Sequence, residues 1–122
     1  MKLYMGGAWQ GKCRLVMKSE NISEDEIAGP EDLPDGKKAL AAYHLRIQKQ
    51  LKQGMDPVRE LERLYEQLPD IILICDEVGA GVIPMEKEKE QYREAVGRCL
   101  CRAAELADEV YRVVCGIGIR IK

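Results

Sequence analysis

The feature of this chain that most constrains its fold is a glycine-rich segment near the N-terminus. Residues 6–13 match the phosphate-binding pattern G-x-x-x-x-G-K-[ST] at every position except the last, which is Cys13. A short apolar run, residues 3–5, precedes the segment, and residues that can form a helix follow it. Strand, loop and helix in this order are the context that the motif requires. The order therefore predicts an α/β fold with a nucleotide-binding loop. That loop comprises Gly6, Gly7, Ala8, Trp9, Gln10, Gly11, Lys12 and Cys13.

The residue types of the loop suit a phosphate better than they suit a metal. Glycines let backbone N–H groups turn inward around a phosphate, and the N-terminus of the following helix adds positive potential. Lys12 can reach the outer phosphates of a nucleotide. Cys13 offers a thiol where a hydroxyl would bind Mg²⁺, a cation that prefers oxygen. Trp9 could stack on a base or contact a partner protein. An ordinary glycine-rich turn without a ligand is the alternative.

Length and charge indicate one globular domain, residues 1–122, with limited classes of partner. Lysines and arginines number 19 against 21 acidic residues, so the net charge is -2. This balance argues against a general nucleic-acid surface or an anionic-membrane surface. The chain has no apolar run of membrane-spanning length, and its first residues lack a signal-peptide core. We therefore expect a cytoplasmic protein without membrane insertion.

The cysteines form an odd set that does not suggest a metal site. None of the five belongs to a C-x-x-C pair, and the one histidine is distant from all of them in sequence. A cytosolic setting also disfavours disulfides. Cys75, Cys99 and Cys115 lie in or at the end of apolar patterns, so we expect them to be buried free thiols.

Hydrophobic periodicity predicts strands and helices that alternate along the chain. Strands are expected at residues 2–5, 71–75, 110–115 and 117–121, and helices at residues 11–18, 37–53, 57–68 and 86–107. The acidic, turn-rich residues 19–36 are expected to be a surface excursion, with a capping box at residues 23–26. The alternation favours a three-layer P-loop fold of the RecA-like kind with a mainly parallel sheet.

A second signal follows the best predicted strand. Asp76 and Glu77 come directly after the apolar run 71–75. In open α/β sheets ligands bind outside the carboxyl ends of the strands, where the glycine loop also lies. Asp76 could hold Mg²⁺, and Glu77 could orient or deprotonate an attacking hydroxyl. The stretch Gly79 to Gly81 fails the dinucleotide fingerprint, because Pro84 occupies the position of the last glycine.

His44 is the only imidazole in the chain, and its place on the apolar stripe of a helix leaves two interpretations open. A packed, hydrogen-bonded histidine in the core or in a pocket wall is favoured over a catalytic one.

Several segments resemble the bifunctional adenosylcobinamide kinase and adenosylcobinamide-phosphate guanylyltransferase family of cobalamin assembly. Residues 76–84 are similar to its [N/D]-E-V-G-x-G-[I/V]-[I/V]-P motif, and residues 92–98 to its F-R-D-x-x-G-R segment. Residues 107–117 resemble its A-D-E-V-x-x-V-V-x-G-I ending, and residues 6–13 its G-G-A-R-S-G-K-S loop. The resemblance covers roughly half of the chain.

The resemblance implies GTP or ATP bound at the glycine loop, with Mg²⁺, and a cobinamide as the second substrate. The cobinamide hydroxyl would be phosphorylated, and GMP would then be transferred through a guanylylated histidine. It also implies a homo-oligomer. In this interpretation the catalytic residues are Lys12, Asp76 and Glu77, with Asp76 on the metal.

A second hypothesis stays open beside the enzyme. The family's H-x-x-R-R-P-x-x-W-x-T-x-E segment has no counterpart in this chain, and Cys13 alters the phosphate loop. These departures favour a catalytically impaired protein that binds a nucleotide or corrinoid in a regulatory or structural role.

Overall fold

A computed structural model of the chain describes residues 1–78 and 87–122. Its strands form a six-stranded sheet in the order β2-β3-β4-β1-β5-β6. The strands are β1 (Lys2–Gly6), β2 (Ile27–Ala28), β3 (Ala39–Leu40), β4 (Ile72–Asp76), β5 (Glu109–Val114) and β6 (Ile117–Arg120). Neighbouring strands run parallel except β5 and β6, which form an antiparallel hairpin. The predicted mainly parallel sheet is confirmed.

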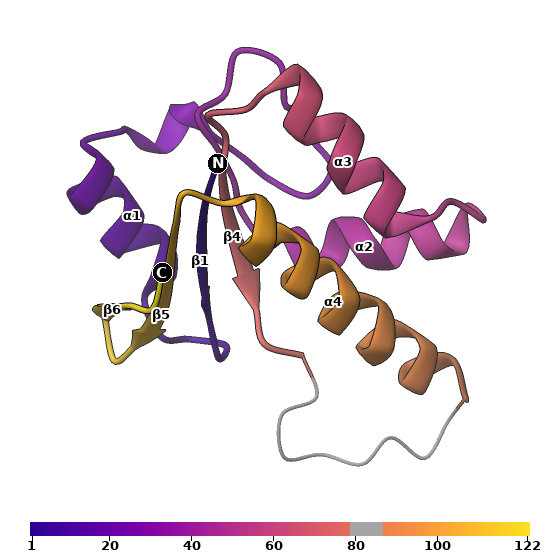
Figure 1. Ribbon diagram of the computed structural model, residues 1–122. Helices are drawn as coiled ribbons and strands as arrows, with labels where there is room; N and C mark the ends of the chain where they lie inside the picture. The colour runs from indigo at the N-terminus through magenta and orange to yellow at the C-terminus, as the bar shows by residue number, and fades with distance from the viewer. Residues whose placement is uncertain (79–86) are drawn as a thin grey trace.

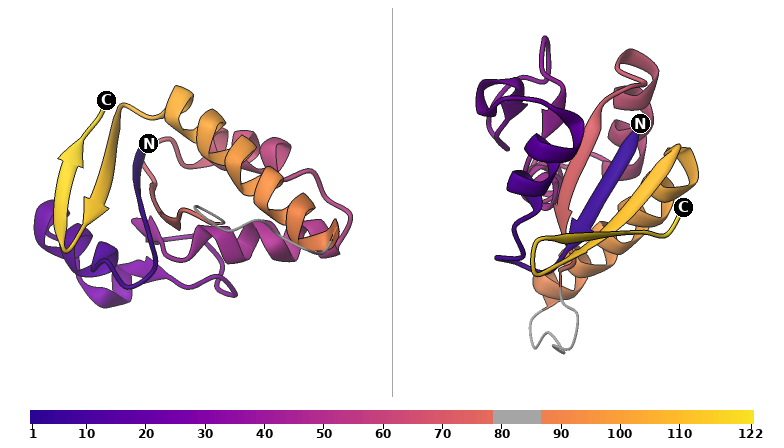
Figure 2. Two further views of the ribbon diagram at one scale, coloured as in Figure 1. Left: turned by 90° about the horizontal axis from the view of Figure 1, so that it is seen from below. Right: turned by 90° about the vertical axis from the view of Figure 1, so that its left-hand side faces the viewer.

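Helices cover both faces of this sheet, so the fold has three layers (Figure 1). They are α1 (Lys12–Glu20), α2 (Tyr43–Lys52), α3 (Pro57–Gln67) and α4 (Lys87–Leu106), with a 3-10 turn at Glu24–Glu26. Helix α1 lies on one face of the sheet, whereas α2, α3 and α4 lie on the other, as a second view also shows (Figure 2). The predicted three-layer α/β architecture is therefore confirmed.

The two faces of the sheet contribute side chains to two separate apolar clusters. Leu3 and Leu73 are buried in the cluster beneath α2, α3 and α4. Tyr4 and Ile74, their neighbours along the strands, are buried in the cluster with Val16 of α1. This alternation follows the two-residue period of a strand, which sends successive side chains to opposite faces. Strand β4 is apolar from Ile72 to Cys75 because it is paired on both edges and covered on both faces.

Local sequence signals account for the ends of the helix pair α2 and α3. Gly54 follows α2 with φ +73°, a left-handed conformation that suits a residue without a Cβ. Asp56 caps α3, because its side chain accepts a hydrogen bond from the Val58 N–H at 3.1 Å. Pro57 occupies the first helical position. The predicted helix hairpin is confirmed.

The predicted start of the helix α2 was wrong. The helix expected over residues 37–53 begins only at Tyr43, because Ala39–Leu40 form strand β3 and pair in parallel with both β2 and β4. A two-residue strand is too short to show a period of two, and Leu40 falls in step with the helical stripe that follows it. The sequence pattern therefore merged the strand with the helix.

The segment 19–36 was also predicted too simply. Its capping box is confirmed, since the Ser23 N–H donates to Glu26 Oε1 at 3.1 Å and both reciprocal contacts are present. Residues 27–28 form β2, however, and Ala28 is fully buried at the edge of the sheet. A two-residue strand inside an acidic, turn-rich stretch carries almost no periodic signal.

The cysteine predictions hold for two of the three positions. Cys75 and Cys99 are buried, and burial raises the pKa of each thiol to about 12. Cys115 is exposed instead, because it forms the turn between β5 and β6 with φ +50°. Within residues 1–78 and 87–122 there is no helix both long and apolar enough to cross a membrane.

Candidate functional site

The glycine loop and the two acids meet at the carboxyl edge of the sheet. Strands β1 and β4 are parallel neighbours, and their register pairs Gly6 directly with Asp76. Both strands point toward the same edge, which is the lower edge in Figure 1. The Glu77 N–H donates to the Gly6 carbonyl oxygen at 2.9 Å and extends this pairing by one residue. The backbone therefore places the acids beside the start of the loop.

A close approach between strands requires glycine at the start of the loop. A Cβ atom built on Gly6 would lie 2.4 Å from the carbonyl oxygen of Val113 in β5. A backbone oxygen cannot move away without displacing its strand, so a side chain here would force β1 and β5 apart. Later in the loop, Trp9 and Gly11 adopt left-handed conformations with φ +63° and +78°. The loop therefore turns twice before α1 begins at Lys12.

The ammonium group of Lys12 is the centre of the site. Its Nζ lies 2.6 Å from Asp76 Oδ1 and donates a hydrogen bond to the Gly7 carbonyl oxygen at 2.7 Å. Only 8% of the Lys12 side chain is exposed, against 26% of the Asp76 side chain. An ammonium group so deeply placed needs a counter-charge, because desolvation would otherwise disfavour it. Lys12 thus joins the loop to the end of β4.

The imidazole of His44 forms the wall behind Asp76. Its Nδ1 accepts a hydrogen bond from the Asp76 backbone N–H at 3.2 Å, and its Nε2 lies 3.5 Å from Asp76 Oδ2. The Tyr92 hydroxyl in turn donates to the His44 carbonyl oxygen at 3.1 Å. Burial lowers the pKa of His44, an effect that the Asp76 carboxylate opposes. The ring is therefore neutral at pH 7, with its proton on Nε2 facing the carboxylate.

The other acid, Glu77, faces a different partner. Its Oε1 lies 3.5 Å from the Nε of Arg112, which comes from β5. The strand between them, β1, ends at Gly6, so this contact reaches across the end of β1. Arg112 thereby holds Glu77 at the edge of the sheet, apart from the Lys12–Asp76 pair.

Cys13 is an exposed residue directly after Lys12. Partial desolvation raises the pKa of its thiol, while Lys12 lowers it and Asp76 raises it. The sulfur is therefore protonated at neutral pH, and a neutral thiol is a poor ligand for Mg²⁺.

The donors present fit a phosphate well and a magnesium ion less well. Lys12 Nζ already contacts an oxygen of its own loop, the Gly7 carbonyl, so a phosphate oxygen can take that position. For Mg²⁺ the site offers the Asp76 carboxylate and no hydroxyl at residue 13. Mg²⁺ commonly binds through one or two carboxylates together with water and substrate phosphates. Asp76 can hold the ion in that way.

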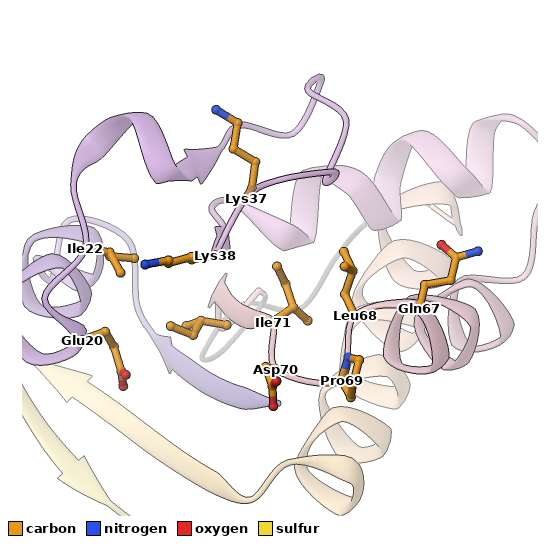
Figure 3. A pocket seen from close by; sticks show the side chains of 10 residues that line it. Glu20, Ile22, Lys37, Lys38, Gln67, Leu68, Pro69, Asp70 and Ile71 are labelled. Carbon is orange, nitrogen blue, oxygen red and sulfur yellow. The ribbon is translucent and has the colours of Figure 1, made fainter.

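A cavity at the opposite edge of the sheet has a different character. It has a volume of about 390 Å³ and lies where β3 and β4 begin, between Lys37, Lys38, Glu20 and Asp70 (Figure 3). Several of its charged groups already have partners within the protein. Glu20 accepts hydrogen bonds from Lys2 and Tyr4, and Lys38 pairs with Glu26 at 2.9 Å. The carboxyl edge, with the Lys12 ammonium at its centre, is therefore the better candidate site.

The structure brings together most of the residues that the sequence singled out. Lys12 and Asp76 are in contact, and Glu77 lies beside them in sequence but pairs with Arg112. Trp9 stands apart, with its side chain 99% exposed. Three contributors were missed, namely Tyr92, Arg112 and the turn at residues 115–116. The family-like segments 92–98 and 107–117 include them, but no pattern indicated that they lie at the site, because each reaches it only through the pairing of β5 with β1 or the packing of α4 on α2. The predicted stretch Gly79 to Gly81 and Pro84 lie outside the described residues.

Comparison with known proteins identifies the family of this chain. The family model for CobU, described as cobinamide kinase / cobinamide phosphate guanyltransferase, matches residues 33–121. The chain belongs to this family. Asp76, Glu77 and His44 lie within the matched residues, whereas the glycine loop lies before them. The assignment of the loop therefore depends on its own motif and on its contact with Asp76.

Two curated relatives of this family match a shorter part of the chain. Both are called bifunctional adenosylcobalamin biosynthesis protein CobU, one from Salmonella typhimurium and one from Escherichia coli. They are 42% and 38% identical to this chain over 52 residues. Each match covers 43% of this chain and 29% of the relative. The similarity thus spans less than a third of each relative's length.

Because Lys12 is almost fully buried, we expect loss of its counter-charge to destabilise the fold. Asp76→Asn should lower the free energy of unfolding by roughly 1–3 kcal/mol, since it leaves a desolvated ammonium without its anion. Lys12→Met should cost less, because Asp76 keeps some contact with solvent. Chemical denaturation of both variants and of the double variant measures the coupling between the two residues.

The exposed ion pair between Arg98 and Glu94 is the matched control. Its side chains are 71% and 59% exposed, so a coupling of about 0–1 kcal/mol is expected there. Strictly additive effects of the Lys12 and Asp76 substitutions would contradict the account of the buried pair.

Proposed function

We propose that the chain binds a nucleoside triphosphate, GTP or ATP, at Gly6–Cys13 and transfers a phosphoryl group from it to a cobinamide. The observation that supports this most is the position of Lys12, held between the loop carbonyl of Gly7 and the carboxylate of Asp76. An ammonium group at the N-terminus of a helix, above a glycine loop, can bind the outer phosphates. Family membership supplies the second substrate, a cobinamide.

The residues of the site have separate tasks in this reaction. The loop N–H groups and Lys12 bind the β- and γ-phosphates and stabilise the charge that develops as the terminal phosphoryl group moves. Asp76 would hold Mg²⁺, which neutralises charge on the phosphate oxygens when it is bound. Glu77, held by Arg112 at the same edge, accepts the proton of the cobinamide hydroxyl. The hydroxyl oxygen then bonds to the γ-phosphorus, the bond to the β-phosphate oxygen breaks, and the nucleoside diphosphate leaves.

The family description includes a second activity, that of a cobinamide phosphate guanyltransferase, and the names of the relatives call them bifunctional. For this chain we propose phosphoryl transfer, because Lys12, Asp76 and Glu77 form a site of that kind. A cytoplasmic location and a homo-oligomeric state remain predictions beside this proposal.

We expect Lys12→Ala to weaken nucleotide binding strongly. Loss of a charge-assisted contact with phosphate should cost about 2–3 kcal/mol, which corresponds to roughly 30- to 150-fold in affinity. Calorimetric titration with GTP and with ATP, in the presence of Mg²⁺, measures the change. Mass spectrometry of mixtures with a cobinamide then tests for the phosphorylated product.

The exposed Lys52 of α2 provides the control, and Lys52→Ala should leave both affinity and product formation unchanged. A Lys12→Ala protein that binds nucleotide as tightly as the parent would refute the assignment of the loop.

A second candidate function follows from Cys13. A protonated thiol at this position favours a protein that holds the nucleotide without transferring a phosphoryl group. Cys13→Ser distinguishes the two candidates, because serine supplies an oxygen ligand of nearly the same size. An enzyme limited by its weak metal ligand should gain Mg²⁺-dependent affinity and turnover on this substitution. A protein that binds without metal should show neither gain in calorimetry nor product by mass spectrometry.

A further inference from the structure

A groove runs from the tip of the glycine loop along the outer side of α1. Its volume is about 440 Å³, within the range of small-ligand sites. One wall is formed by Arg14 and Lys18 of α1, and the other by the turn at Cys115 and Gly116 between β5 and β6. Trp9 lies at its mouth. The groove also includes Gly11, so it continues directly from the phosphate-binding loop.

Trp9 is presented to solvent in a way that packing does not explain. Its side chain is 99% exposed, and its backbone has φ +63°, a conformation that is uncommon for a residue with a large side chain. An exposed aromatic surface of this size is unfavourable in water, whereas a flat ligand would cover it. Stacking on an aromatic side chain is a common way to bind a nucleobase.

The wall on α1 carries positive charge that the fold does not use. Arg14 and Lys18 are four residues apart, so they lie on the same side of the helix. Both are exposed, and neither forms an ion pair with any residue in the described part of the chain. Cations at this position suit a ligand that carries phosphate and ribose oxygens next to its base.

The opposite wall is held against the glycine loop by one residue, Gln10, through both its side chain and its backbone. Gln10 Oε1 accepts a hydrogen bond from the Cys115 N–H at 2.7 Å, and the Gln10 carbonyl oxygen accepts one from the Gly116 N–H at 2.7 Å. Cys115 and Gly116 both have positive φ, as a two-residue hairpin turn requires. The turn is thus held in place before a ligand binds, which lowers the ordering cost of binding.

We propose that this groove receives the nucleoside part of the nucleotide, with Trp9 stacking on the base and the docked hairpin turn forming the facing wall. The inference rests on the proposed binding of the phosphates at Gly6–Cys13 and extends it to the base and ribose. The groove suits a nucleoside better than a corrinoid, because a corrin ring system is several times larger than a purine.

Trp9 is the only tryptophan in the chain, so its fluorescence reports on the groove directly. The 122-residue protein should be titrated with GTP, with ATP and with inorganic tripolyphosphate. We expect at least one nucleotide to quench the Trp9 emission, while tripolyphosphate binds to the loop and leaves the emission nearly unchanged. Calorimetry provides the affinities of all three ligands.

Substitution of Trp9 separates stacking from any effect on the loop. Trp9→Ala should weaken binding of the nucleotide about 10-fold, the order expected for one lost stacking contact, and should leave tripolyphosphate affinity unchanged. Trp9→Phe should restore most of the nucleotide affinity. Leu33→Ala, at an exposed apolar residue with 78% of its surface accessible, is the control and should change neither affinity.

The outcomes separate the inference from the function on which it rests. If tripolyphosphate binds but nucleotides bind no more tightly, or if Trp9→Ala weakens both ligands equally, the nucleoside groove is refuted and the phosphate loop stands. If neither tripolyphosphate nor a nucleotide binds to the parent protein, both proposals are overturned.

Discussion

The contact between the Lys12 ammonium and the Asp76 carboxylate is the interaction on which the candidate site depends. It joins the first turn of α1 to the end of β4 across 2.6 Å, and a hydrogen bond to Gly7 ties the loop to the same nitrogen. The pair forms because β1 and β4 are parallel neighbours whose register places Gly6 opposite Asp76. Phosphate oxygens could replace the carboxylate and the carbonyl oxygen as partners of the Lys12 ammonium, since they provide the same kind of contact.

The rest of the site supports this pair from three sides. His44 and Tyr92 link Asp76 to α2 and α4, while Arg112 holds Glu77 from β5. On the far side of the loop, Gln10 fixes the turn between β5 and β6. Helices α2 and α4 and strand β5 therefore position the two acids, and the turn between β5 and β6 positions the glycine loop. Such preorganisation is what phosphoryl transfer requires of a protein, because most of its catalysis is positioning and charge stabilisation.

The sequence predicted the parts of this arrangement that are local or strongly patterned. The glycine loop, the buried strand β4 and the Asp56 cap of α3 each leave a mark within a few neighbouring residues. Strands β2 and β3 have no recognisable sequence pattern, because two residues cannot display the period of a strand. Leu40 even fitted the apolar stripe of the helix that follows it. The contacts of His44 with Asp76 and of Gln10 with Cys115 join residues 32 and 105 positions apart. Only the folded sheet brings such residues together, so no spacing rule could have predicted them.

The central claim is that the Lys12–Asp76 pair marks the place where a nucleotide places its outer phosphates. A crystal structure of the chain with a non-hydrolysable analogue of GTP or ATP and Mg²⁺ tests this claim most directly. The account predicts that Lys12 Nζ leaves the Gly7 carbonyl oxygen and contacts oxygens of the β- and γ-phosphates, with Asp76 turned toward the metal. A triphosphate bound elsewhere on the protein, with Lys12 still on Gly7 and Asp76, would contradict it.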